Sequence, residues 1–210
     1  MIFKLCGLKE KNALICCEAN NVDFFGLVFY EKSPRNINHN EAKQLVEFSK
    51  NLEIKPVGVF VNHKISDLID IIKLLNLKYI QLHGDESQSY INEIKNEFKL
   101  KIIKNISIKN EGDLDKINNF KNIDYLLFDY KPKSDELPGG NSKSFDWNLL
   151  KEVTIKLPWF VSGGINESNI KNIKKTINPH GIDLSSGVEE SLGIKSNEKI
   201  NKLFRLFYDN

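Results

Sequence analysis

The sequence predicts an α/β fold, a single closed (β/α)8 barrel of parallel strands that extends over residues 1–210. Eight short apolar runs follow one another along the chain, and amphipathic segments with helical periodicity lie between them. No Pro-, Gly- or Ser-rich linker divides the chain into separate domains. Barrels of roughly 200 to 250 residues commonly form one domain, so a small TIM barrel fits this length. An open doubly wound sheet is the alternative fold.

The apolar runs have the features of buried parallel strands. Most are too short for helices, and several are bounded by Gly or Pro. They comprise residues 3–6, 24–29, 57–61, 79–82, 101–106, 125–129, 159–161 and 182–184.

The segments between these runs predict helices. In residues 66–75, Leu68, Ile71, Ile72 and Leu75 occupy one helical face, and Ser66 is the expected N-cap. Further helices are expected over residues 9–20, 40–52, 87–98, 111–120, 167–177 and 197–208, with a short one at 148–153.

The charge balance limits the classes of partner. Thirty Lys and Arg against 28 Asp and Glu give a net charge of +2, which offers no electrostatic case for nucleic acid or a membrane surface. We therefore expect a small-molecule ligand. Cys6, Cys16 and Cys17 form an odd set without metal-ligand spacing, so we expect reduced thiols, no metal site and a cytoplasmic location.

Arginine is rare among these cations, because only Arg35 and Arg205 occur beside 28 Lys. Arg35 follows Ser33 and Pro34 in a predicted loop, and a guanidinium grips a carboxylate or phosphate through two bonds. We therefore expect Arg35 to contact a ligand. Arg205 belongs to a helical pattern, and we expect it to lie on the solvent-exposed face of that helix.

Polar and small residues follow the predicted strands. In a barrel the carboxyl ends of the strands build the active site, frequently with a phosphate site after strands 7 and 8. The glycines allow close backbone approach, and serine hydroxyls with adjacent N–H groups accept a phosphate. These strand ends hold Cys6, Gly7, Gln81, His83, Gly84, Asp129, Ser162, Gly163, Gly164, Asp183, Ser185, Ser186 and Gly187.

Motifs along nearly the whole chain give a resemblance to a known family. They are Lys4-Leu5-Cys6-Gly7, Gly26-Leu27-Val28-Phe29, Ser33-Pro34-Arg35, Val57-Gly58-Val59-Phe60-Val61, Gln81-Leu82-His83-Gly84, Gly139-Gly140, Phe145-Asp146-Trp147, Gly163-Gly164 and Asp183-Leu184-Ser185-Ser186-Gly187-Val188-Glu189, with Gly193 and Lys195 beyond. In this order they resemble phosphoribosylanthranilate isomerase of tryptophan biosynthesis.

The resemblance implies an Amadori rearrangement without a cofactor, on a phosphorylated small molecule, by a monomer or homodimer. N-(5-phosphoribosyl)anthranilate would become 1-(2-carboxyphenylamino)-1-deoxyribulose 5-phosphate. Asp129 would be the general acid and Cys6 the general base. Arg35 would hold the anthranilate carboxylate. The phosphate would be held by Gly163, Gly164, Ser185 and Ser186, and the substrate-binding set also includes Gln81, His83 and Asp183.

Both catalytic roles make demands on their surroundings. Cys6 has to be shifted toward the thiolate by neighbouring N–H groups or positive charge, because a free thiol titrates near ~8.5. Asp129 has to be partly desolvated, or to act through a strong hydrogen bond, if it is to donate a proton. Without the resemblance, Cys6 alone would be interpreted as a buried hydrophobe and Asp129 as a helix cap or ion-pair partner.

Two other functions stay open at this point. One is the related isomerase of histidine biosynthesis. Its family carries a carboxylate at the end of strand 1, where this chain has Cys6, and an internal repeat, which is not found in this sequence. The other is a silent barrel that binds phosphorylated ligands without turnover. The chain also departs from the resembled family at Gly139-Gly140-Asn141-Ser142, where Gly-Gly-Thr-Gly is common, which predicts an altered geometry of that loop.

Overall fold

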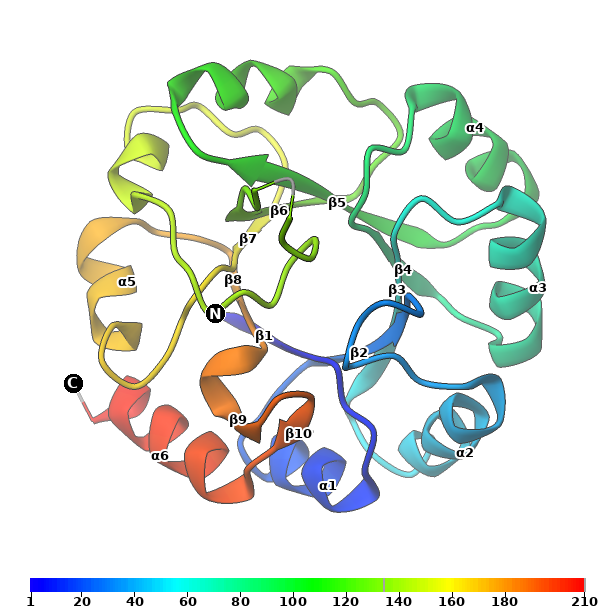
Figure 1. Ribbon diagram of the computed structural model, residues 1–210, viewed down its shortest axis with the longest axis horizontal. Coiled ribbons are helices and arrows are strands. Elements are labelled where there is room, and N and C mark those ends of the chain that lie inside the picture. Colours follow the sequence, from blue (N-terminus) through cyan, green and yellow to red (C-terminus); the bar gives the residue numbers. More distant parts are fainter. Residues whose placement is uncertain (134, 210) are drawn as a thin grey trace.

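Eight parallel strands close into a barrel in the computed structural model, which describes residues 1–133 and 135–209 (Figure 1). Each strand pairs with the next in chain order, and the last pairs with the first. The strands are β1 (Ile2–Cys6), β2 (Phe24–Phe29), β3 (Lys55–Phe60), β4 (Tyr79–Leu82), β5 (Lys101–Ile108), β6 (Tyr125–Tyr130), β7 (Trp159–Val161) and β8 (Gly181–Leu184). The predicted barrel is confirmed, because β1–β8 pairing excludes an open sheet, and each strand end lies within two residues of its prediction.

Helices form an outer ring around the strands (Figure 1). After β5 and β6 the connections contain 3-10 helices in place of α-helices. The helices are α1 (Lys11–Ala19), α2 (His39–Ser49), α3 (Ile65–Leu75), α4 (Gln88–Glu97), η1 (Glu111–Asn118), η2 (Trp147–Leu150), α5 (Ile170–Thr176), η3 (Ser186–Val188) and α6 (Asn197–Tyr208). Helix α6 has the predicted bounds, and Arg205 on it is exposed, as expected.

The expected N-cap of α3 is wrong. The helix begins at Ile65, and its N-cap is Lys64, which makes no side-chain capping bond. Ser66 already lies in the first turn, and its hydroxyl donates to Asp67 Oδ1 at 3.0 Å. The serine hydroxyl is thus bonded to a neighbouring carboxylate and caps no backbone N–H group.

Helix α5 is shorter than predicted because asparagine side chains form a turn before it. Asn166 Oδ1 accepts from the backbone N–H and the hydroxyl of Ser168, at 2.9 and 2.6 Å. Asn169 Oδ1 in turn accepts from the N–H of Asn166 at 2.9 Å. Such local bonds compete with helix formation, so the helix starts only at Ile170.

The barrel interior contains an apolar layer of its own. It is separate from the larger hydrophobic core between strands and helices. Its buried members are Phe24, Val57, Ile103, Leu127 and Phe160, and Ile2, Tyr79 and Tyr125 at the starts of β1, β4 and β6 pack against them. Since side chains alternate between the two faces of a strand, the next inward positions lie closer to the strand ends.

A small hairpin follows β8 and was not predicted. Strands β9 (Glu189–Ser191) and β10 (Ile194–Lys195) are antiparallel, and Gly193 with φ of 83° lies in the turn between them. A side chain at Gly193 would have its Cβ 2.6 Å from the carbonyl oxygen of Pro34. The hairpin therefore packs closely on the loop that carries Arg35.

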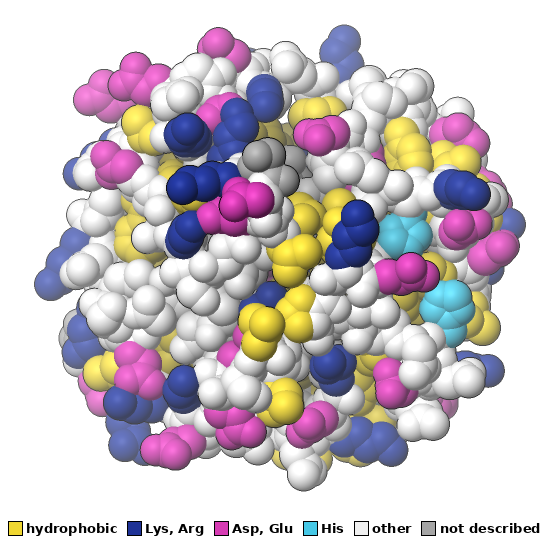
Figure 2. Space-filling view, viewed as in Figure 1, with side chains coloured by type: hydrophobic (Ala, Val, Ile, Leu, Met, Phe, Trp, Pro, Cys, Tyr) yellow, Lys and Arg dark blue, Asp and Glu magenta, His cyan; other side chains and the backbone are white. Residues whose placement is uncertain are grey.

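Charges are mixed on the face shown in Figure 2, where basic and acidic side chains are interspersed around the rim. Within residues 1–133 and 135–209, no helix is long and apolar enough to cross a membrane. This face offers no single-sign patch for an extended polyanion, in keeping with the net charge of +2.

Candidate active site

A cavity lies at the carboxyl ends of the strands and collects side chains from most of them. Seven of the ten predicted site residues line it, namely Cys6, Arg35, Gln81, His83, Asp129, Asp183 and Ser185. The other three, Gly163, Gly164 and Ser186, line a small adjoining cavity that shares Asp129, Asp183 and Ser185 with the first. The structure thus brings all ten predicted residues together.

A buried ion pair lies below Cys6. Lys4 precedes Cys6 by two residues on the same face of β1, and its Nζ donates to both carboxylate oxygens of Asp183 at 3.0 Å. Burial opposes the charge on Lys4, but Asp183 and Cys6 outweigh it and raise the pKa of the ammonium. The pair joins the first strand of the barrel to the last beneath the site.

The environment of Cys6 differs from the one that we expected. Burial raises the pKa of the Cys6 thiol, and the nearby charges of Lys4, Lys195 and Arg35, which act in the opposite direction, do not compensate for it. The charges of the chain alone therefore do not supply the shift toward the thiolate that a general base requires. Desolvation of the sulfur outweighs the surrounding positive charge, so the thiol is largely protonated at neutral pH.

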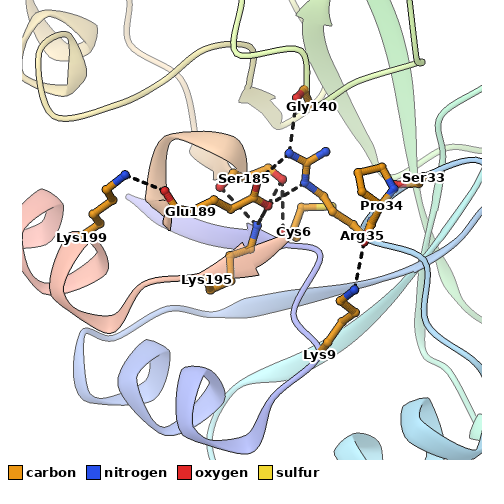
Figure 3. A network of polar contacts seen from close by, with 10 residues as sticks. All are labelled: Cys6, Lys9, Ser33, Pro34, Arg35, Gly140, Ser185, Glu189, Lys195 and Lys199. Atoms are coloured by element: carbon orange, nitrogen blue, oxygen red, sulfur yellow. Dashed lines mark hydrogen bonds and ion pairs between the residues drawn. The ribbon is translucent and has the colours of Figure 1, made fainter. Parts of the chain in front are cut away.

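Arg35 is buried and held by a carboxylate of the protein itself (Figure 3). Its Nε donates to Glu189 Oε1 and its Nη2 to Glu189 Oε2, both at 2.7 Å. Nη2 also donates to the carbonyl oxygen of Gly140 at 3.4 Å. Lys195 Nζ donates to Glu189 Oε1 at 2.6 Å, so two cations share one carboxylate.

No role was predicted for Glu189 and Lys195 from the sequence. Both residues belong to the motifs on which the family resemblance rests, and this resemblance could have indicated that they have a role. Burial disfavours the charge of Glu189, but hydrogen bonds from Arg35 and Lys195 hold the pKa of its carboxyl below the usual range. Burial lowers the pKa of Lys195 despite its contact with Glu189.

On the opposite wall, Gln81 and His83 are hydrogen-bonded to each other, and His83 lies beside Asp129. Gln81 Nε2 lies 2.8 Å from His83 Nδ1, and His83 Nε2 lies 3.4 Å from Asp129 Oδ2. When the Gln81 amide donates to Nδ1, the proton of the neutral ring is on Nε2 and faces Asp129. Asp129 Oδ1 accepts from the Tyr130 N–H at 2.7 Å. His83 therefore supports Asp129, and both oxygens of the carboxyl group have neighbours.

Glycines leave the space in which Asp129 lies. A Cβ at Gly139 would be 2.7 Å from His83 Nε2, and one at Gly163 would be 2.9 Å from Asp129 Oδ1. Both residues also have positive φ, 89° and 87°. Ser142 has φ of 56°, a backbone conformation that favours glycine. The departure from the Gly-Gly-Thr-Gly pattern thus places a strained serine in the loop beside the site.

The remaining cysteines lie apart from the cavity. Cys16 and Cys17 are buried on α1, and all three cysteines are free. Within the described part of the chain, no group of three or more His, Cys, Asp or Glu side chains is arranged to hold a metal ion. The chemical groups that line the cavity thus include a thiol, two carboxyl groups, an imidazole, an amide, hydroxyls and one guanidinium.

Comparison with known proteins gives a family match over almost the whole chain. The family model described as N-(5'phosphoribosyl)anthranilate (PRA) isomerase matches residues 3–205. A protein of this name from Paramagnetospirillum magneticum is 35% identical over 204 residues, covering 96% of this chain and 94% of that protein. The one from Rhizobium rhizogenes is 38% identical over 203 residues, covering 96% and 91%.

Solved structures agree with the sequence relatives. The phosphoribosyl anthranilate isomerase of Thermotoga maritima is 27% identical, with a TM-score of 0.88 and full coverage of both chains. A further phosphoribosyl anthranilate isomerase, in complex with reduced 1-(o-carboxyphenylamino)-1-deoxyribulose 5-phosphate, is 26% identical, with a TM-score of 0.85 and full coverage of both chains.

Proposed function

The chain belongs to the N-(5'-phosphoribosyl)anthranilate isomerase family, and we propose that it catalyses the Amadori rearrangement of N-(5-phosphoribosyl)anthranilate in tryptophan biosynthesis. As a member of this family it is an isomerase. The product is 1-(2-carboxyphenylamino)-1-deoxyribulose 5-phosphate, and the reaction needs no cofactor because the sugar itself is oxidised at C2 and reduced at C1. The observation that carries the proposal is one cavity lined by Cys6 and Asp129, from opposite parts of the barrel.

Asp129 is the proposed general acid. It donates a proton to the ring oxygen of the ribose as the bond between that oxygen and C1 breaks. The nitrogen lone pair forms the C1=N bond, so the open sugar is a protonated Schiff base. His83, whose Nε2 lies 3.4 Å from Asp129 Oδ2, then stabilises the carboxylate that remains.

Cys6 is the proposed general base. Its thiolate removes the proton from C2, and the C2–H electron pair forms a C1=C2 bond while the C=N electrons return to nitrogen. The resulting enolamine tautomerises to the ketone: the C2 hydroxyl loses its proton as the C2=O bond forms, and the C1=C2 electron pair takes up a proton at C1. Because burial keeps the free thiol protonated, only a minor thiolate fraction is ready to act at neutral pH, and Lys4, Lys195 and Arg35 are the charges that favour it.

Substrate binding uses the two ends of the cavity. Arg35 holds the anthranilate carboxylate through the part of its guanidinium that Glu189 does not occupy. Backbone N–H groups and hydroxyls at Gly163, Gly164, Ser185 and Ser186 hold the phosphate in the adjoining small cavity. Gln81, His83 and Asp183 complete the wall between these ends.

The proposal extends to the setting of the enzyme. We propose that residues 1–210 act as one barrel domain in the cytoplasm, with a phosphorylated small molecule as partner and without nucleic acid or membrane. The active form is a monomer or homodimer. One structure of the Thermotoga maritima relative, 27% identical with a TM-score of 0.84, is described as monomers generated from a dimeric enzyme.

A turnover assay tests the function. Phosphoribosylanthranilate is generated from anthranilate and phosphoribosyl pyrophosphate, and its fluorescence is followed with correction for spontaneous hydrolysis. We expect rapid conversion by the wild type and a loss of roughly 100- to 10,000-fold in kcat for Cys6→Ser and for Asp129→Asn, since each removes one proton-transfer group. Product identity is checked by mass spectrometry.

Matched controls are Cys16→Ser on α1 and Asp115→Asn on an exposed position of η1, which should leave kcat unchanged. A folded wild type without turnover would overturn the isomerase proposal. Binding of phosphorylated ligands in that case would favour the silent barrel. Full activity of Cys6→Ser or Asp129→Asn would overturn the assigned roles while leaving the reaction in place.

A further inference from the structure

We propose that Glu189, fixed by Lys195, is a positioning residue that holds one edge of Arg35 and thereby presents the other edge to the carboxylate of the substrate. The inference rests on the proposed function, because it assigns a purpose to Glu189 in the recognition of the anthranilate carboxylate. It concerns a carboxylate of the protein that does not itself touch the substrate.

The contacts of Arg35 define which edge is free. Nε and Nη2 form two parallel bonds of 2.7 Å to the carboxylate oxygens of Glu189, and both side chains are only 5% exposed. Nη1 makes no hydrogen bond within residues 1–133 and 135–209. A second carboxylate can therefore reach Arg35 only through the edge formed by Nη1 and Nη2.

Gly140 lies directly against that edge. Its carbonyl oxygen accepts weakly from Nη2, at 3.4 Å, and its φ is 71°. A Cβ at this position would collide with Nη1. Because only glycine fits this close to the guanidinium, the loop after β6 and the hairpin after β8 contact its two edges, and an entering carboxylate replaces the weak bond to Gly140 (Figure 3).

Lys195 holds the carboxylate of Glu189, which in turn orients Arg35. Its Nζ donates to Glu189 Oε1 at 2.6 Å and to the carbonyl oxygen of Ser185 at 3.2 Å, and the side chain is 2% exposed. Lys199 on α6 donates to the backbone oxygen of Glu189 at 2.6 Å. With its side chain and backbone both held, Glu189 cannot follow Arg35 if an entering anion pulls on the guanidinium.

The charges of the three side chains are suited to one incoming carboxylate. Arg35 and Lys195 carry two positive charges, and Glu189 neutralises one of them in a nearly dry environment. One charge remains for the substrate. Without Glu189, Arg35 would lose its orientation and two buried cations would face each other, which is unfavourable in a low dielectric.

The decisive variant is Glu189→Gln, and its matched control is Glu190→Gln, because Glu190 is the exposed neighbour on the same strand. Binding is measured with reduced 1-(o-carboxyphenylamino)-1-deoxyribulose 5-phosphate and with the same compound lacking the carboxylate. For Glu189→Gln we expect affinity for the carboxylated compound to fall about 10- to 100-fold, the loss associated with hydrogen bonds to a charged group. KM should rise in parallel, with kcat within about threefold of the wild type.

Three further measurements separate positioning from a general structural role. Affinity for the compound without the carboxylate should change little in Glu189→Gln. In an Arg35→Ala background, Glu189→Gln should cause no further loss, because its effect passes through Arg35. Glu189→Asp, which keeps the charge but shortens the side chain, should fall between the wild type and Glu189→Gln. It also serves as the test variant if thermal unfolding shows that Glu189→Gln does not fold.

The outcomes distinguish this inference from the proposed function. A wild type that neither binds the carboxylated compound nor turns over overturns the function itself. An active wild type with an unchanged Glu189→Gln variant overturns the inference alone. Equal losses for both compounds, or additive losses with Arg35→Ala, would show that Glu189 maintains the fold of the rim and does not position Arg35.

Discussion

The two halves of the barrel interior differ in the polarity of their side chains. Toward the strand starts, Phe24, Leu127 and Phe160 belong to an apolar cluster. Toward the strand ends, the interior holds the buried pair Lys4–Asp183 and, above it, the polar groups of the cavity. In the apolar half, packing and area removed from water supply stability. In the other half, the buried charged side chains act strongly on the Cys6 thiol and on a bound substrate, because the dielectric constant is low. Removing these charges from water costs free energy.

The largest effect on stability is expected in the apolar half. Phe160 on β7 is fully buried, so Phe160→Ala should lower the free energy of unfolding by about 3 to 5 kcal/mol. At low temperature the folded fraction should keep its kcat, because Phe160 does not line the cavity. Urea unfolding and the turnover assay measure the two quantities.

The control for this prediction is Leu192→Ala, at a side chain that is 69% exposed, with an expected change within about 0.5 kcal/mol. Loss of kcat in the folded Phe160→Ala protein would show that the two halves are coupled, and it would contradict the division drawn above.

Breaking the buried ion pair should affect both stability and activity. Lys4→Met leaves Asp183 buried without its cation, and removal of one partner of such a pair costs about 3 to 5 kcal/mol. Replacing both partners, in Lys4→Met/Asp183→Leu, should restore most of the stability measured in urea, whereas turnover should stay low. A double variant as unstable as the single one would show that the pair is needed for folding.

A smaller effect concerns the reactivity of Cys6. Burial raises the pKa of its thiol, so alkylation by iodoacetamide should be slower than for a free cysteine at neutral pH and should still be increasing at about pH 8.5. Because the pKa in the folded state lies above that of the unfolded chain, this group's contribution to stability is complete below about pH 8.5. It is lost as the pH rises through the folded-state value.

Mass spectrometry of the labelled peptide follows this reaction, and Cys6→Ser gives the background from Cys16 and Cys17. Labelling of Cys6 that is complete and independent of pH between 6 and 8 would contradict a protonated thiol. Faster labelling in Glu189→Gln is expected, since the neighbouring cations would then be without their carboxylate partner.

The smallest effect is expected on the outer surface. Glu47 on α2 and Lys50, directly after the helix, form an ion pair of 2.6 Å. Their side chains are 69% and 64% exposed. Glu47→Gln should change the free energy of unfolding by less than about 0.5 kcal/mol, because solvent screens the pair. A loss near that of Lys4→Met would show that burial does not govern the strength of ion pairs in this protein.

Much of the fold was predictable because parallel strands are buried on both faces. Continuous apolar runs therefore mark β2 and β7, and both have their predicted bounds. The hairpin of β9 and β10 has only three and two residues per strand, too few for a periodic pattern. Asn166 and Asn169 delay the start of α5 through bonds that depend on side-chain geometry rather than on hydrophobic periodicity.

The residues of the candidate site were predictable from the sequence, but the contacts between their side chains were not. Strand ends and the family resemblance indicated Cys6, Arg35 and Asp129. No pattern showed that Arg35 is held by Glu189, because the two residues are 154 positions apart in the chain. Lys4 lay within an apolar run and was assigned no role, since its burial depends on Asp183 at the other end of the sequence.

The closure of β1 on β8 also has a consequence for synthesis on the ribosome. Lys4 is made 179 residues before Asp183, which corresponds to about 10 to 40 seconds at roughly 5 to 20 residues per second. Throughout that time the nascent chain carries Lys4 and Cys6 without the strand that completes their surroundings. The candidate active site is thus assembled only after translation has passed β8, whatever part of the barrel has already folded.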